Sequence, residues 1–263
     1  MLQRIGSYTL VAFVLGLGAC AKHQPVVEVN GECTEAYQAH VCTSAKMQGH
    51  QVVDVGVMLP VAAIENAPEG EGQMVWPPVP TAVLQLPESA QQASGFTQFT
   101  MFWDPMGHPP ATYMTPHFDF HFYTVPAAER SGIDCLDTTK PAALPAGYSL
   151  PDEPLPPPMV QLTGVSTLVG ICVPQMGMHS LLTTEFESKT TFRGSMVVGY
   201  YHGKPIFIEP MLSRAMLLEK RSFDLPIPSI PGMEGNYPRL FHAEYDPQAN
   251  AYRFAFSDFR SGA

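Results

Sequence analysis

The chain is poor in charged residues, and above all in basic ones. Only 14% of its 263 residues are charged, and 14 Lys and Arg stand against 24 Asp and Glu, giving a formal net charge of −10. Binding to phosphate groups needs clustered Lys and Arg. The charge balance therefore argues against nucleic acid, and against an anionic lipid surface, as the main partner.

Sequence motifs of several well-known chemistries are also missing. The chain has no G-x-S-x-G nucleophile elbow, no glycine-rich phosphate loop and no H-E-x-x-H. Its five cysteines include no C-x-x-C pair, which disfavours a redox motif or a zinc knuckle. The sequence thus leaves open whether the protein is an enzyme.

Proline is abundant, and this composition favours a β-rich fold. The chain has 27 prolines and is 45% hydrophobic, so it can bury a core but has few stretches suited to long helices. Short apolar stretches alternate with Pro and Gly turns, which predicts a β-rich sandwich or distorted barrel with one or two short helices. The expected strands are 51–60, 82–86, 97–103, 117–125, 165–173, 195–201, 205–209, 242–245 and 252–256. The best short helix is 211–220.

The N-terminus has the pattern of an export signal. Arg4 precedes an apolar segment, Tyr8–Leu17, that is shorter than the roughly 20 residues of a membrane-spanning helix. The sequence Leu17-Gly18-Ala19-Cys20 resembles a bacterial lipobox. That resemblance implies a signal peptide at 1–19 and a lipid on Cys20, whereas an ordinary secretory signal is the alternative.

This interpretation gives an expected location and domain organisation. Ala21 follows the cysteine, which by the same resemblance favours the periplasmic face of the outer membrane. The membrane would be contacted through the N-terminal lipid. We expect residues 20–45 to be the lipidated cysteine and a tether, and residues 46–263 to form a single β-rich domain. Whether that domain forms a homo-oligomer is left open.

The remaining cysteines are even in number, as in many exported proteins. Cys33, Cys42, Cys135 and Cys172 would form two disulfides, with three possible connectivities. We favour Cys33–Cys42, which closes a short local loop, together with Cys135–Cys172, which spans a proline-rich segment.

The most informative segment is the run His117-Phe118-Asp119-Phe120-His121-Phe122-Tyr123. Successive side chains of a strand point to opposite faces, so the phenylalanines share one face while two histidines and an aspartate share the other. Imidazole and carboxylate groups are ligands for Zn, Mn, Fe or Cu. A solvated strand face is the alternative interpretation.

Strand geometry limits how these three side chains can cooperate. His117 and His121 lie roughly 13 Å apart along a regular strand, so both reach one ion only if they lean inward or if the strand bulges. Asp119 is more easily paired with one histidine, either as a ligand or as the group that orients a ligand.

Other parts of the chain would have to complete such a site. His179 follows an apolar segment, and Glu209 ends another, although Glu209 could instead cap the following helix. We predict a site for a divalent transition metal (Zn, Mn, Fe or Cu) with the ligands His117, His121, His179 and Glu209. Asp119 and His108 would bind the ion or orient the ligands.

The same residues carry a resemblance to a known family. The run from Trp103 to Pro110, then Tyr113 and the segment 116–123, resembles a bacterial family of exported proteins of unknown function, the TTHB-type domain. Residues 176–179 and 203–211 are similar as well, and the resemblance covers about residues 50–220. It implies an exported β-rich domain but no reaction. Ser180 departs from the aromatic residue expected after the histidine.

Two alternatives to metal binding stay open from the sequence. The protein could be a non-catalytic binding module of the cell envelope, with the histidine face as its contact surface. The His, Asp and Glu groups could also form a buried hydrogen-bonded network that fixes the fold.

Overall fold

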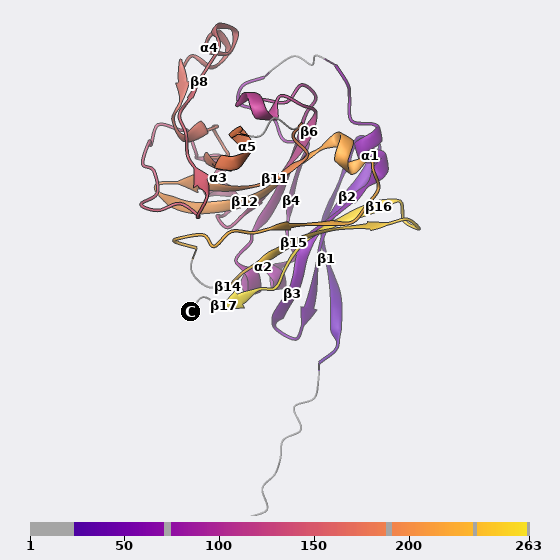
Figure 1. Cartoon of the computed structure of the whole chain (residues 1–263). Coiled ribbons are helices and arrows are strands. Elements are labelled where there is room, and N and C mark those ends of the chain that lie inside the picture. Colours follow the sequence, from indigo (N-terminus) through magenta and orange to yellow (C-terminus); the bar gives the residue numbers. More distant parts are fainter. Residues whose placement is uncertain (1–23, 71–74, 188–190, 234–235, 262–263) are drawn as a thin grey trace, which may run out of the picture.

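The computed structural model describes residues 24–70, 75–187, 191–233 and 236–261. Two large antiparallel sheets pack face to face (Figure 1). In order across the first sheet lie β1 (Val26–Ala36), β2 (Ala39–Gln48), β3 (Gln51–Pro60), β16 (Ala251–Ser257), β15 (Leu240–Asp246) and β13 (Phe223–Pro226). In order across the second lie β4 (Ala82–Gln85), β5 (Gln98–Asp104), β6 (His117–Tyr123), β12 (Lys204–Ser213), β11 (Gly194–Tyr201), β10 (Met178–Leu182) and β7 (Tyr148–Ser149).

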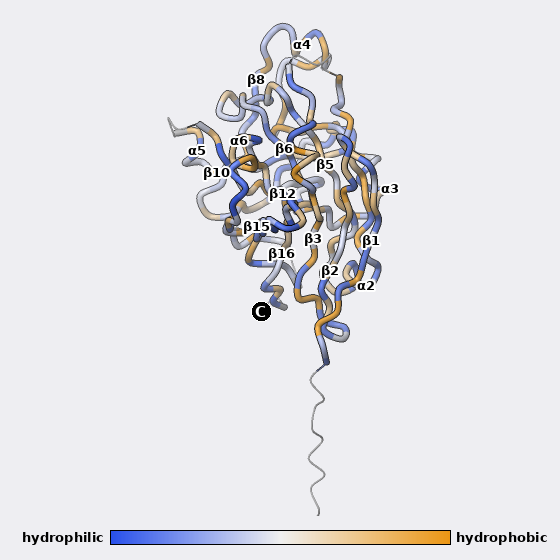
Figure 2. The backbone as a smooth tube through the Cα atoms, turned by 90° about the vertical axis from the view of Figure 1, so that its right-hand side faces the viewer, coloured by the Kyte–Doolittle hydropathy of each residue, from blue (hydrophilic) through white to orange (hydrophobic). Residues whose placement is uncertain are grey.

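Smaller elements surround the two sheets. Two short strand pairs are β8 (Glu153–Pro154) with β9 (Thr167–Leu168), and β14 (Asn236–Tyr237) with β17 (Arg260–Ser261). The helices are α1 (Val61–Glu65), α2 (Glu88–Ser94), α3 (Ala127–Ser131), α4 (Pro157–Thr163), α5 (Thr183–Glu187) and α6 (Arg214–Leu217), with 3-10 turns η1 (Ala111–Tyr113) and η2 (Val169–Ile171). Figures 1 and 2 show α4 and β8 at one end of the molecule, away from both large sheets. Within the described residues, no helix has the length and apolar character needed to cross a bilayer.

The prediction of a β-rich sandwich is confirmed, with more short helices than the one or two expected. Residues 211–220 are not one helix, because Met211 and Leu212 pair with β6 and β11 and so extend β12. Helix α6 begins only after Ser213, whose side chain caps it by accepting a hydrogen bond from the Met216 amide.

The expected tether at 20–45 is largely part of the sandwich. Residues 26–36 and 39–48 form β1 and β2, and β2 pairs in turn with β3. Polar residues are frequent in β1 because it is an edge strand whose side chains are mostly exposed. The folded domain therefore begins near Val26 rather than near residue 46.

Both expected disulfides are present. Cys33 and Cys42 are cross-strand neighbours of β1 and β2, and their bond ties the edge strand to the sheet. The bond between Cys135 and Cys172 joins two segments that lie over the second sheet.

The core between the sheets is rich in aromatic side chains. Phe118, Phe120 and Phe122 of β6 are fully buried in it. The Phe120 and Phe254 ring centroids are 4.9 Å apart, and those of Phe122 and Phe256 are 4.8 Å apart. The phenylalanine face of β6 is thus the core face, as its sequence predicts.

We expect Phe122→Ala to lower the free energy of unfolding by about 3–5 kcal/mol, because it removes a fully buried ring and leaves a cavity between the sheets. Urea unfolding with the disulfides intact would measure the loss. Val83→Ala is the matched control, since Val83 is 41% exposed and should change stability little. Equal effects of the two substitutions would contradict the assignment of Phe122 to the core.

Candidate metal centre

The second face of β6 is buried as completely as the first. His117, Asp119 and His121 are 0%, 5% and 1% exposed. An apolar cluster that includes Ile133, Ile171 and Phe192 lies over this side of the sheet. The alternative of a solvated strand face is therefore excluded, and the polar groups must find partners in the interior.

Strand pairing brings three of the predicted ligands together. His121 lies on β6, Glu209 on the neighbouring β12 and His179 on β10. The Glu209 Oε2 atom is 3.5 Å from His121 Nε2 and 3.9 Å from His179 Nε2. One ligand atom from each residue lies within 4.8 Å of the others, so the three could hold a metal ion. We call them the inner cluster.

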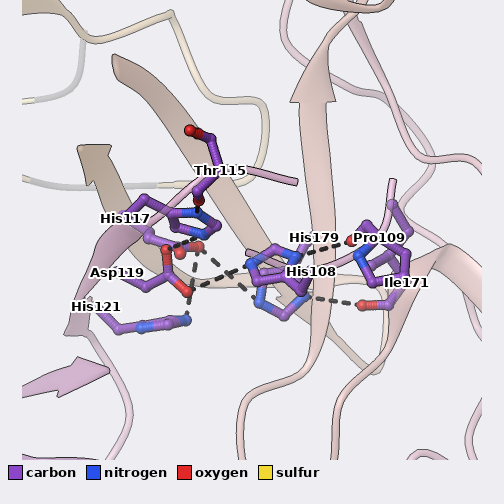
Figure 3. A network of polar contacts seen from close by, with 9 residues as sticks. His108, Pro109, Thr115, His117, Asp119, His121, Ile171 and His179 are labelled. Carbon is purple, nitrogen blue, oxygen red and sulfur yellow. Dashed lines mark hydrogen bonds and ion pairs between the residues drawn. The ribbon is translucent and has the colours of Figure 1, made fainter. Parts of the chain in front are cut away.

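His117 does not join this group, and the expected four-ligand arrangement around one point is not formed. Its Nε2 atom instead lies 3.2 Å from Asp119 Oδ1, while His108 Nε2 lies 3.4 Å from Asp119 Oδ2 (Figure 3). Asp104 completes this second group, whose ligand atoms also lie within 4.8 Å of one another. We call Asp104, His108, His117 and Asp119 the outer cluster, because the His108 side chain is 36% exposed.

Asp104 is the member that the sequence did not single out. It ends β5 and pairs directly with His117 across the two strands. Its position at the start of the DPMGHPP turn makes it look like an ordinary turn residue. Only the register between β5 and β6 places its carboxylate beside the other three side chains.

Backbone carbonyls fix the orientation of three imidazoles. The Nδ1 atoms of His117, His108 and His179 lie 2.6, 2.8 and 2.9 Å from the carbonyl oxygens of Thr115, Pro109 and Ile171, respectively. A carbonyl oxygen can only accept, so each Nδ1 carries the hydrogen. Each Nε2 then faces a carboxylate (Figure 3), which is the arrangement that metal-binding histidines usually adopt.

Several buried polar atoms at these clusters have no hydrogen-bond partner within the described part of the chain. They are His117 Nε2, Asp119 Oδ1, both ring nitrogens of His121, and Glu209 Oε2. A buried polar atom without a partner costs about 1–3 kcal/mol. Two of the five atoms belong to the outer cluster and face each other there, and His121 Nε2 and Glu209 Oε2 do the same in the inner cluster, so a cation in each cluster would satisfy two of them.

Burial sets the charge of the inner cluster. It lowers the pKa of His179 to about 4 and, with His179 nearby, holds the pKa of His121 well below its usual range. Burial and the neighbouring Asp119 raise the pKa of Glu209 well above its usual range. Both imidazoles are therefore neutral near pH 7, with a lone pair free for a metal ion.

The outer cluster is more strongly charged. Burial opposes both shifts, yet His117 and His108 hold the pKa of Asp119 well below its usual range, while Asp119 and Asp104 raise that of His108 to about 10. Burial and the proximity of Asp119 raise the pKa of Asp104 to about 6. The carboxyl groups of Asp104 and Asp119 and a histidine, His108, that holds its proton near pH 7 thus lie together at one end of β6.

Phe207 closes the inner cluster on its apolar side. Its ring centroid lies 4.8 Å from that of His121 and 5.2 Å from that of His179. Gly199 pairs with both His179 and Phe207, and a Cβ atom there would come within 1.9 Å of the Phe207 ring. The absence of a side chain at Gly199 is what lets the ring cover both imidazoles.

Comparisons with known proteins add nothing to this geometry, because no family model, curated protein or solved structure matches the chain. The resemblance to the TTHB-type domain stays a prediction.

We expect Gly199→Ala to lower the free energy of unfolding by about 1–3 kcal/mol, because the buried Phe207 ring has to move. Chemical denaturation would measure it. Gly132→Ala is the control: its new Cβ would meet its nearest neighbour at 3.4 Å, an ordinary contact. A Gly199→Ala protein as stable as the Gly132→Ala protein would contradict the close packing of Phe207.

Proposed function

We propose that the protein is an exported metal-binding protein whose inner cluster holds one divalent transition-metal ion. The observation that carries this proposal is the convergence of three buried donor groups from three strands. Two of the converging atoms, His121 Nε2 and Glu209 Oε2, form no hydrogen bond with any residue that the structure describes. A metal ion would supply the missing partner of both.

The chemistry of the donors fits Zn, Mn, Fe or Cu. Two imidazoles and one carboxylate are the ligand set of several catalytic zinc sites and of non-haem iron sites. Three protein ligands leave a coordination position for water or a substrate group. An ion held in this way could polarise that group or lower the pKa of a bound water.

The alternative of a hydrogen-bonded structural network is less well supported. The contacts of Glu209 with His121 and His179, at 3.5 and 3.9 Å, exceed the usual lengths of hydrogen bonds. Among the described residues, neither ring nitrogen of His121 has a hydrogen-bond partner. A network that served only to fix the fold would satisfy its buried members.

Elemental mass spectrometry tests the metal proposal. The full-length chain would be purified without a polyhistidine tag, incubated with Zn, Mn, Fe or Cu, and freed of excess metal. We expect the inner cluster to retain about one equivalent, and His121→Ala and Glu209→Gln each to weaken its binding by more than the roughly 10–100-fold that loss of an orienting partner costs. Glu209→Gln keeps the size of the side chain and replaces one of its two carboxyl oxygens with an amide NH2 group, which cannot bind a metal ion.

His242→Ala is the matched control for these variants. His242 also pairs with an aspartate, Asp224, but lies on the other sheet and is 40% exposed. Its loss should leave metal content unchanged. A wild-type protein that retains none of the four metals would overturn the proposal, and the cluster would then be structural.

We propose further that the chain is anchored by a lipid on Cys20 at the periplasmic face of the outer membrane. Residues 1–23 lie outside the described part of the chain, so this proposal is supported by the lipobox-like sequence and by the two disulfides, which are typical of oxidising compartments. The non-enzymatic alternative, a binding module of the envelope, shares this location.

Replacing Cys20 tests the proposed lipid anchor. Cys20→Ser should move the protein from the membrane fraction to the soluble periplasmic fraction in a Gram-negative host, as measured by immunoblotting after fractionation. Cys33→Ser/Cys42→Ser is the control, because it removes cysteines without touching the signal. Membrane association that survives Cys20→Ser would refute lipid anchoring at this residue.

A further inference from the structure

The outer cluster has the features of a metal site in its own right. It offers two imidazoles and two carboxylates, whose ligand atoms lie within 4.8 Å of one another. None of its four members belongs to the inner cluster. This donor set suits the same borderline divalent metals.

The loop between β5 and β6 holds His108 close to the other members of the outer cluster. Gly107 has a positive φ of 71°, and a Cβ atom there would come within 2.1 Å of the Tyr113 carbonyl oxygen. The turn therefore packs tightly against residues 113–115 and returns His108 over β6, where its ring centroid lies 4.7 Å from that of His117.

Unsatisfied atoms point into the outer cluster as they do into the inner one. His117 Nε2 and Asp119 Oδ1 are buried and 3.2 Å apart, and neither forms a hydrogen bond among the residues described. Asp119 directs one oxygen to each imidazole, and both imidazoles present Nε2. We propose that the outer cluster binds a second divalent metal ion, separate from the ion of the inner cluster.

Strand geometry fixes the relation between the two ions. Asp119 and His121 are two residues apart on the same face of β6, a separation of roughly 6.6 Å along the strand. No residue belongs to both clusters, so none of these seven side chains would bridge the two ions. The two ions would be neighbours with separate ligands, and the partly exposed His108 places the outer ion nearer to solvent.

The inference uses residues different from those of the proposed function, so the two can fail independently. Metal content would be measured on the full-length, untagged chain after incubation with Zn²⁺. We expect two equivalents in the wild type and one in each of Asp119→Asn and His179→Ala. His242→Ala should keep both ions.

Should Asp119→Asn fail to fold, His108→Ala is the second test, because His108 is the most exposed histidine of the two clusters. We expect at least a tenfold weaker second binding step in that variant, by calorimetric titration with Zn²⁺. Anomalous scattering from Zn-loaded crystals should show two separate peaks, one at each cluster.

Two results would overturn the inference. One is a single equivalent in the wild type that survives His108→Ala and Asp119→Asn but is lost in His179→Ala, which leaves the inner site standing. The other is no bound zinc at all, in which case His108 and Asp119 form only an ion pair. A single equivalent lost in His108→Ala but kept in His179→Ala would support the outer site and refute the inner one.

Discussion

Strand β6 has to bury both of its faces, and those faces carry opposite chemistry. The phenylalanines fill the space between the two sheets, where apolar burial is favourable. The histidines and the aspartate between them point the other way and are equally buried. A strand with period two cannot turn one set inward without turning the other set to the opposite side. The apolar cluster that includes Ile133, Ile171 and Phe192 covers this polar face and keeps it out of water.

Burying the polar face costs free energy, and hydrogen bonds within the chain offset only part of that cost. Backbone carbonyls satisfy one nitrogen of three imidazoles and leave the other nitrogen pointing at a carboxylate. The disulfide partner Cys172 directly follows Ile171, whose carbonyl orients His179, so the cross-link steadies the segment that holds this ring. The polar atoms left without partners lie where ligands would surround a cation. A ready-made donor set of this kind is what metal binding requires of a folded protein.

The sequence predicts local features of this site better than its assembly. Alternation along 117–123 gives the two faces, and the strand rise shows that His117 and His121 cannot easily share an ion. Their separation into two clusters follows that geometric limit. Glu209 and His179 reach His121 only through the register of β6, β12, β11 and β10, which no local pattern specifies. The place of Asp104 beside His117 likewise depends on the register between β5 and β6, which no local pattern specifies.

The sequence predicts the edge of the first sheet less well than its centre. Residues 26–45 combine frequent polar residues with small ones, and that composition suits a linker as well as an exposed edge strand. Pairing with β3 and the Cys33–Cys42 bond decide in favour of the strand. Conversely, the helical propensity of residues 211–220 yields to strand pairing as far as Ser213. In both cases long-range contacts override local preference.

The aromatic wall beside the inner cluster links packing to chemistry. Phe207 touches both imidazoles, excludes water from them and so helps to keep them uncharged. The same low-polarity surroundings make the unpaired His121 nitrogens and Glu209 oxygen costly. A cation bound between His121 Nε2 and Glu209 Oε2 would relieve a large part of that cost. The packing that makes the cluster unfavourable without an ion would therefore also favour binding of one, and this packing depends on Gly199 leaving room for the Phe207 ring.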